Sequence, residues 1–194
     1  MKFFLDLGAH CFEGLDKMVS EYQIDSTWEV HSFEPNPDPL MHQKIRQEIE
    51  RRKNININFH AEAVGESDAM VRYEHVSNLG DIANNTRSWF SGWSTYATVK
   101  QIDFSCFLEG LDIKEEDFVV CKCDIEGLEF YLLDHLIKKG TINLIDHLYV
   151  EWHAENQWGH EWPTHLSDEQ IIKFKNIKNQ VKTALTQTKV FDWD

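Results

Sequence analysis

The chain has 194 residues, of which 42% are hydrophobic and 12% aromatic, so it can form one domain with a substantial core. Its formal net charge of −14 makes nucleic acid a poor partner, because an acidic surface repels phosphate backbones. No apolar run approaches the ~20 residues of a membrane span, and Asp6 interrupts the N-terminal apolar segment too early for a signal peptide. Cys121 and Cys123 fall inside an apolar run and are expected to be buried free thiols. We therefore expect a cytoplasmic protein without membrane insertion. Residues 1–194 form a single domain or one domain of a longer protein, and the sequence carries no signal of oligomeric state.

Apolar runs alternate with helical patterns, which is typical of an α/β fold with a mainly parallel central sheet and helices on both faces. Strands are predicted over residues 2–8, 28–35, 55–64, 117–124, 144–153 and 188–194. Helices are predicted around residues 15–22, 37–53, 128–137 and 174–185. Lys138, Lys139 and Gly140 favour a helix end, and Ser167 with Gln170 suggests a capping box.

The segment between the third and fourth predicted strands breaks this alternation. Residues 69–76 and 96–104 have the pattern of two strands, and a polar loop containing tryptophan separates them. We interpret this segment as an inserted β-hairpin.

Acidic residues occur at the ends of five successive predicted strands. In an open α/β sheet, ligands bind beyond the carboxyl ends of the strands, so these acids are expected to face one crevice. A random solvated surface would not place them so regularly. The five acids are Asp6, Glu34, Glu62, Asp124 and Glu151.

The first strand-to-helix turn argues against a dinucleotide. Gly8 allows a tight turn, but Phe12 and Glu13 stand where a pyrophosphate would need glycine and space. Glu34 follows the second strand and suits an acid that accepts hydrogen bonds from ribose hydroxyls. An acid-rich pocket fits S-adenosylmethionine, which carries a sulfonium and an ammonium beside one carboxylate.

Five segments together resemble the FkbM-type S-adenosylmethionine-dependent methyltransferases. The segments are FFLDLGAH, HSFEPNPD, AEAVG, VVCKCDIEGLEFYLL and LYVEWH, which span residues 3–153. The resemblance implies a Rossmann-like class I methyltransferase fold and O-methylation, often of a sugar or polyketide hydroxyl. His10 stands where the family commonly has Asn, and Phe12 stands where it has a glycine.

The same resemblance assigns cofactor-binding residues. Asp6, Gly8 and Ala9 would line the methionine part, and Glu34 would hold the ribose. Glu62 and Ala63 would flank the adenine, and Asp124 would lie beside the transferred methyl. His10, Pro35 and Asn36 lie in the adjoining loops and complete the predicted cofactor-binding residues.

Methylation of a hydroxyl needs a group that removes a proton. The candidate bases are Asp124, Glu126, Glu151 and His153, and His153 is expected to titrate near neutral pH. Lys122, within a buried strand, needs a carboxylate partner and is interpreted as a structural or orienting residue. A divalent metal held by Asp124, Glu151 and His153 is an alternative, but their spacing fits no standard pattern and no metal is expected.

Aromatic residues of the hairpin loop are candidates for an acceptor surface, with Trp152 on the opposite wall. They would stack on the apolar faces of a sugar, although ordinary hairpin packing explains them equally well. The candidates in the hairpin are Trp89, Trp93, Ser94 and Tyr96. We therefore expect a glycan or small-molecule acceptor. The alternatives are a methyltransferase for another kind of substrate and a non-catalytic binding module with this fold.

Overall fold

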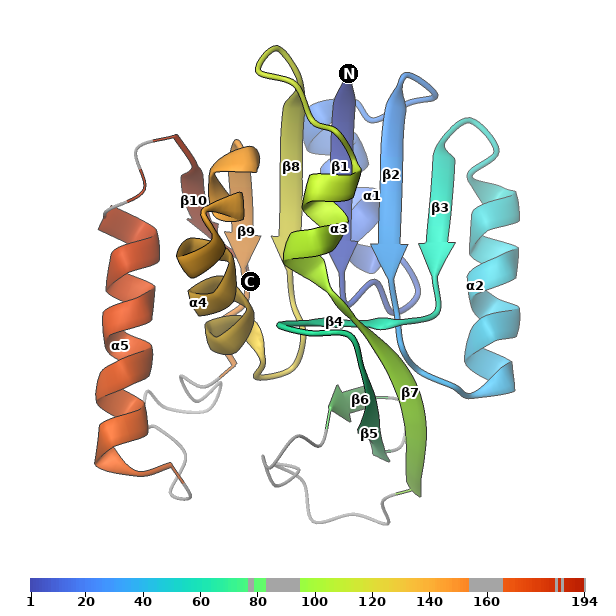
Figure 1. Cartoon of the computed structure of the whole chain (residues 1–194). Coiled ribbons are helices and arrows are strands. Elements are labelled where there is room, and N and C mark those ends of the chain that lie inside the picture. Colours follow the sequence, from blue (N-terminus) through green and yellow to red (C-terminus); the bar gives the residue numbers. More distant parts are fainter. Residues whose placement is uncertain (77–78, 83–94, 154–165, 184, 186, 194) are drawn as a thin grey trace.

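The protein is described by a computed structural model that covers residues 1–76, 79–82, 95–153, 166–183, 185 and 187–193. A six-stranded sheet with the order β10-β9-β8-β1-β2-β3 forms its centre, and every neighbouring pair of strands is parallel (Figure 1). This is the doubly wound Rossmann order, which confirms the predicted fold. The strands are β1 Lys2–Leu7, β2 Trp28–Phe33, β3 Asn56–His60, β8 Phe118–Cys123, β9 His147–Val150 and β10 Lys189–Asp192.

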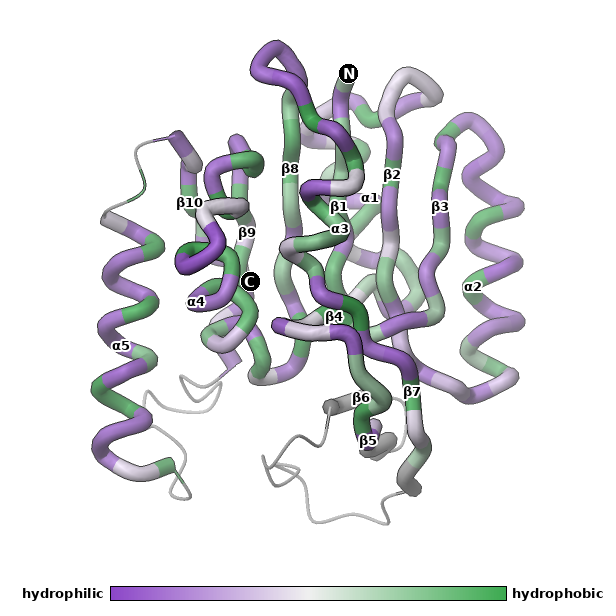
Figure 2. Tube along the Cα trace, viewed as in Figure 1, coloured by the Kyte–Doolittle hydropathy of each residue, from purple (hydrophilic) through white to green (hydrophobic). Residues whose placement is uncertain are grey.

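Helices cover both faces of this sheet. The helices α1 (Glu13–Tyr22) and α2 (Pro39–Arg51) pack on one face, where Leu15 and Met18 meet Phe4. The helices α3 (Phe104–Gly110), α4 (Glu129–Lys139) and α5 (Asp168–Thr183) pack on the other face, and a 3-10 turn, η1 (Thr141–Leu144), follows α4. Hydrophobic and hydrophilic residues alternate along α2 and α5, as expected for helices with one buried face (Figure 2). Among the described residues, no helix combines the length and the apolar character that crossing a membrane requires.

The helix ends follow the predicted capping residues. Ser167 and Gln170 exchange two hydrogen bonds at the start of α5, which confirms the capping box. Gly140 ends α4 with a φ of 79°, a left-handed conformation that glycine adopts without strain. The α1 helix ends at Gln23, which adopts the same conformation with a φ of 54° although it has a side chain.

The inserted hairpin is confirmed and is part of a second sheet, which lies beyond the carboxyl edge of the first (Figure 1). The strands β5 (Ala69–Val76) and β7 (Thr95–Asp103) are antiparallel, and β4 (Ala63–Gly65) and β6 (Leu79–Ile82) flank them.

The predicted single strand over residues 55–64 is therefore wrong. Its pairing with β2 ends at His60, and Ala63–Gly65 instead pairs in parallel with β7. The chain turns at Glu62, between the two sheets. The other difference is α3, which begins at Phe104 because the Asp103 side chain accepts hydrogen bonds from the backbone of Ser105 and Cys106.

Candidate active site

A cavity of about 450 Å³ lies at the carboxyl ends of β1, β2 and β8. The strand order reverses between β1 and β8, which is where doubly wound sheets bind ligands. Nine of the residues predicted from the sequence line it: Gly8, Ala9, His10, Glu34, Pro35, Glu62, Ala63, Asp124 and Glu126. Sequence reasoning missed Lys17, Tyr73 and Trp193, which line it as well.

The cavity wall is predominantly acidic. Its carboxylates come from Glu13, Glu34, Glu62, Asp124 and Glu126. Against these five acids, only two lysines, Lys17 and Lys122, belong to the described lining. Such a wall attracts a cation and disfavours a polyphosphate.

The turn between β1 and α1 comes very close to the end of β8. Gly8 has a φ of 78°, and a Cβ atom at this position would lie 1.7 Å from the carbonyl oxygen of Asp124. Only glycine fits here. The backbone N–H groups of Gly8 and Ala9 both donate to the carbonyl of Phe33, which ties the turn to β2.

The position that a pyrophosphate occupies in dinucleotide-binding proteins is taken here by the carboxylate of Glu13. This carboxylate accepts a hydrogen bond from the backbone N–H of Cys11 at 3.1 Å and lies 3.3 Å from the His10 ring. A second anion beside it would be repelled.

Glu34 is a buried carboxylate at the end of β2, with 7% of its surface exposed. Its Oε1 accepts the backbone N–H of Asn36 and its Oε2 that of His10, both at 2.9 Å. Burial raises the pKa of Glu34, and these two bonds oppose the rise. Each oxygen keeps a further lone pair for a ligand donor. Asn36 does not belong to the described lining of the cavity, and it acts on the site by positioning Glu34.

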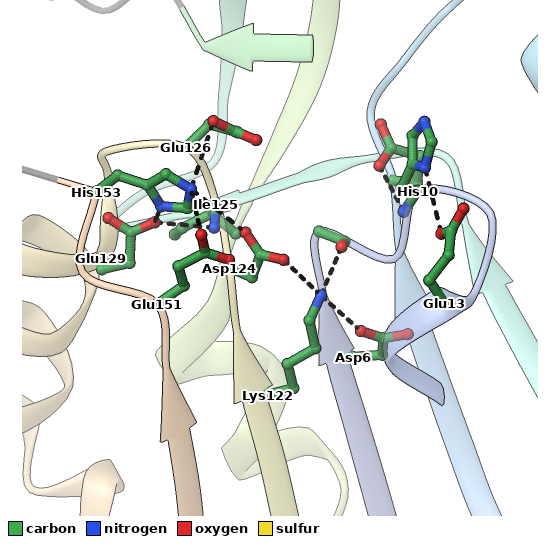
Figure 3. Close-up of polar contacts among 12 residues, drawn as sticks. Asp6, His10, Glu13, Lys122, Asp124, Ile125, Glu126, Glu129, Glu151 and His153 are labelled. Carbon is green, nitrogen blue, oxygen red and sulfur yellow. Dashed lines mark hydrogen bonds and ion pairs between the residues drawn. The ribbon is translucent and has the colours of Figure 1, made fainter. Parts of the chain in front are cut away.

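A buried lysine joins the turn after β1 to the end of β8 (Figure 3). The Lys122 ammonium donates to the carbonyl of Gly8 at 2.8 Å and pairs with Asp124 at 3.0 Å and Asp6 at 3.3 Å. Although burial alone lowers the pKa of Lys122, the two carboxylates raise it above its ordinary value. Asp6 is fully buried and does not line the cavity within the described part of the chain, so it contacts Lys122 in place of the predicted cofactor.

His153 lies within a group of four carboxylates (Figure 3). Its Nδ1 is 2.9 Å from Glu129, and its Nε2 lies 3.4 Å from Glu151, 3.5 Å from Glu126 and 3.7 Å from Asp124. Glu129 is fully buried in the first turn of α4, and it accepts the backbone N–H groups of Ile125 and Gly127. It therefore fixes the loop that carries Asp124 and Glu126. Glu129 belongs to the segment VVCKCDIEGLEFYLL, but the sequence did not predict its role.

The expectation that His153 titrates near neutral pH is wrong. Burial alone lowers its pKa, but the charges of Glu129, Glu126 and Glu151 outweigh burial and raise the pKa to about 10. His153 is thus an imidazolium at neutral pH. Burial raises the pKa of Glu126 to about 7, although the His153 charge opposes this rise. Burial and Asp124 also raise the pKa of Glu151, which lies outside the described lining of the cavity.

Asp124, Glu126 and His153 each bring one potential metal-ligand atom within 4.8 Å of the others. This set contains Glu126 where the sequence suggested Glu151.

The structure describes only some of the residues predicted to form an acceptor surface. Trp152 packs against Phe130 in the core, donates from its Nε1 to Asp192 at 2.9 Å and does not belong to the described lining of the cavity. Tyr96 pairs with Glu74 through the β7 and β5 backbones, and its side chain is outside the described part. Trp89, Trp93 and Ser94 lie outside the described residues. From the hairpin, the described side chain that reaches the cavity is that of Tyr73.

The chain belongs to a family of methyltransferases. The family model of the methyltransferase FkbM domain matches residues 6–176, and the chain belongs to this family, as its motifs predicted. The chain is also similar to the crystal structure of methyltransferase FkbM from Methylobacillus flagellatus KT, with 17% identity and a TM-score of 0.48. That similarity covers 78% of this chain and 33% of the other, so the chain spans about a third of its length. No curated protein matches the chain.

Proposed function

We propose that the chain uses S-adenosylmethionine to methylate a hydroxyl of a sugar or glycan. The family supports methyl transfer. The observation that carries the choice of cofactor is the buried Glu34 carboxylate in an acidic cavity at the switch point of the sheet. A methyltransferase for another small molecule and a non-catalytic binding module remain the alternatives.

The residues present fit this cofactor. Glu34 has acceptor capacity left for two ribose hydroxyls, because each of its oxygens accepts one backbone N–H and carries two lone pairs. Glu62 and Ala63 border the place for the adenine, and Gly8 allows the close backbone approach of the methionine part. When bound, S-adenosylmethionine supplies an electrophilic methyl group on a cationic sulfur, and the acidic wall favours that charge.

Glu126 is the group best placed to take the proton of the acceptor hydroxyl. It lines the cavity, and its side chain is 40% exposed. His153 is already protonated, and Asp124 is bound to the Lys122 ammonium. A carboxylate with a pKa of about 7 exchanges a proton efficiently near neutral pH. His153 and Glu129 hold Glu126 in place without contacting the substrate.

The acceptor class rests on the acidic, aromatic character of the chain. A net charge of −14 disfavours nucleic acid, and 12% of the residues are aromatic. Sugars present apolar faces for stacking and hydroxyls for carboxylates. This combination favours a neutral carbohydrate over an anionic acceptor.

Calorimetry with S-adenosylmethionine and S-adenosylhomocysteine tests the cofactor. Binding of both is expected, and the variant Glu34→Gln should bind about tenfold more weakly or worse, since one lost charge-assisted hydrogen bond is worth about 1.5 kcal/mol or more. Glu50→Gln, an exposed site on α2, is the matched control. Absence of binding to the unaltered chain would refute the proposed cofactor, and an unchanged affinity of Glu34→Gln would refute the ribose assignment.

A methyl-transfer screen against rhamnosides, fucosides and other glycans tests the acceptor. The variant Glu126→Gln should retain cofactor binding and lose turnover at neutral pH. Transfer only to acceptors that are not carbohydrates would overturn the acceptor class, and normal turnover by Glu126→Gln would remove it as the base.

A further inference from the structure

One cation in the cavity wall has no carboxylate partner among the described residues. The Lys122 ammonium donates to the Gly8 carbonyl and forms ion pairs with Asp124 and Asp6. The His10 ring lies against Glu13. Lys17, on α1, is the remaining cationic residue of the described lining.

The acids that normally pair with such a lysine are engaged elsewhere. On a helix, residues four apart are neighbours, so Glu13 and Glu21 are the expected partners of Lys17. The Glu13 carboxylate instead meets the Cys11 backbone and the His10 ring, and Glu21 accepts the hydroxyl of Tyr149. The charge of Lys17 is therefore left for another anion.

An aromatic ring orients the free ammonium. The Nζ of Lys17 lies 4.1 Å from the centroid of the Trp193 ring, a close cation–π contact. The backbone N–H of Trp193 donates to the carbonyl of Val150 at 2.9 Å, and its ring meets Tyr149 edge-on at 6.0 Å. These contacts hold the indole, and thereby the ammonium, at one end of the cavity.

This end is opposite to the place proposed for the nucleoside. Glu62 follows β3 and Glu34 follows β2, on one side of β1 in the sheet. Trp193 follows β10 and is bonded to β9, on the other side. A ligand whose ribose meets Glu34 and whose chain passes Gly8 therefore ends near Lys17.

We propose that Lys17 and Trp193 form the subsite for the carboxylate of the amino-acid part of the cofactor. This inference rests on the proposed function. The ammonium of Lys17 binds the carboxylate, which is the one anionic group of that ligand, and Trp193 is a positioning residue that holds Lys17. The cavity thus offers carboxylates to the two cationic groups of the ligand and a lysine to the anionic one.

Two ligands separate this subsite from the rest of the cavity. S-adenosylhomocysteine carries the amino-acid carboxylate, whereas 5′-methylthioadenosine has the same nucleoside and sulfur without it. Calorimetry on the full chain should show that Lys17→Met weakens S-adenosylhomocysteine about tenfold, as for one charge-assisted contact, and changes 5′-methylthioadenosine less than about twofold. Trp193→Leu should show a smaller loss with the same selectivity.

Two further variants act as controls. Lys17→Arg keeps the charge and should retain most of the affinity for S-adenosylhomocysteine. Lys53→Met removes an exposed lysine outside the cavity lining and should change neither ligand. Equal losses for both ligands in Lys17→Met, or no loss for either, would overturn the carboxylate subsite. If the unaltered chain binds neither ligand, the proposed function itself fails.

Discussion

Replacing His153 with glutamine should destabilise the protein by an amount that depends on pH. The imidazolium of His153 lies between the carboxylates of Glu129, Glu126, Glu151 and Asp124, and only 8% of its side chain is exposed. Glutamine has a similar reach and can donate to Glu129, but it carries no charge. The substitution therefore leaves four neighbouring carboxylates without their shared cation.

The magnitude follows from the proton that His153 binds more tightly in the folded chain. Its pKa rises from 6.5 to about 10, so this stabilisation is complete below pH 6.5 and is lost as the pH rises through 10. Because one pKa unit corresponds to about 1.4 kcal/mol, the contribution is about 5 kcal/mol near pH 6 and about 1 kcal/mol near pH 9. Removing one partner of a buried ion pair typically costs about 3–5 kcal/mol, which is the same range.

Urea denaturation followed by tryptophan fluorescence at pH 6, 7.5 and 9 measures this effect, since the chain has seven tryptophans. The difference in free energy of unfolding between the unaltered chain and His153→Gln should shrink steadily with rising pH. His147→Gln is the control, because burial lowers the pKa of His147 and the cost of its loss should not shrink over this range. A difference that is constant with pH for His153→Gln would refute the view that the carboxylates hold its proton.

Two glycine substitutions test the backbone of the turns. Gly8→Ala should abolish cofactor binding and lower the melting temperature, because a Cβ atom 1.7 Å from the Asp124 carbonyl oxygen forces the turn away from β8. Gly110→Ala is the control and should do neither, because a Cβ atom there meets no atom within 4 Å. A Gly8→Ala variant that binds the cofactor normally would contradict the close approach of the two loops. Gln23→Gly should raise the free energy of unfolding by about 0.5–1 kcal/mol, since it relieves a left-handed residue at the end of α1, whereas Ser20→Gly within that helix should lower it by about the same amount. Urea titration measures the free energy of unfolding of Gln23→Gly and Ser20→Gly. If both variants lose the same free energy of unfolding, the strain at Gln23 is negligible.

An acid near a predicted strand end does not always line the cavity. Glu34, Glu62 and Asp124 all follow the last paired residue of a strand and line the cavity, as expected for parallel strands that end at one edge. Asp6 lies two residues earlier in the register, inside β1 and paired with Lys122 of β8, so its side chain is covered by the sheet and its neighbours. Sequence patterns locate strand ends only to within one or two residues, so they do not tell whether an acid lies inside the strand or just beyond it.

The protonation state of His153 could not be predicted from the sequence, for a different reason. Its four carboxylate neighbours come from the loop after β8, the first turn of α4 and the end of β9. Spacing along the chain indicated that these segments meet at one edge, but not that Glu129 turns back to face the imidazole. Electrostatic partners that depend on side-chain direction appear only in the folded structure.

Two residues of the turn after β1 adopt a left-handed backbone conformation although both carry a Cβ atom. His10 and Phe12 stand where Asn and glycine were expected, and both have positive φ values, 43° and 69°, which those two residue types tolerate best. A left-handed conformation costs about 1–2 kcal/mol for a residue with a Cβ atom. Phe12 is fully buried in the core beside α1, and burial of such a side chain contributes about 1.5–3 kcal/mol. Burial thus offsets the strain at Phe12, and the turn brings the backbone N–H of His10 to the Glu34 carboxylate.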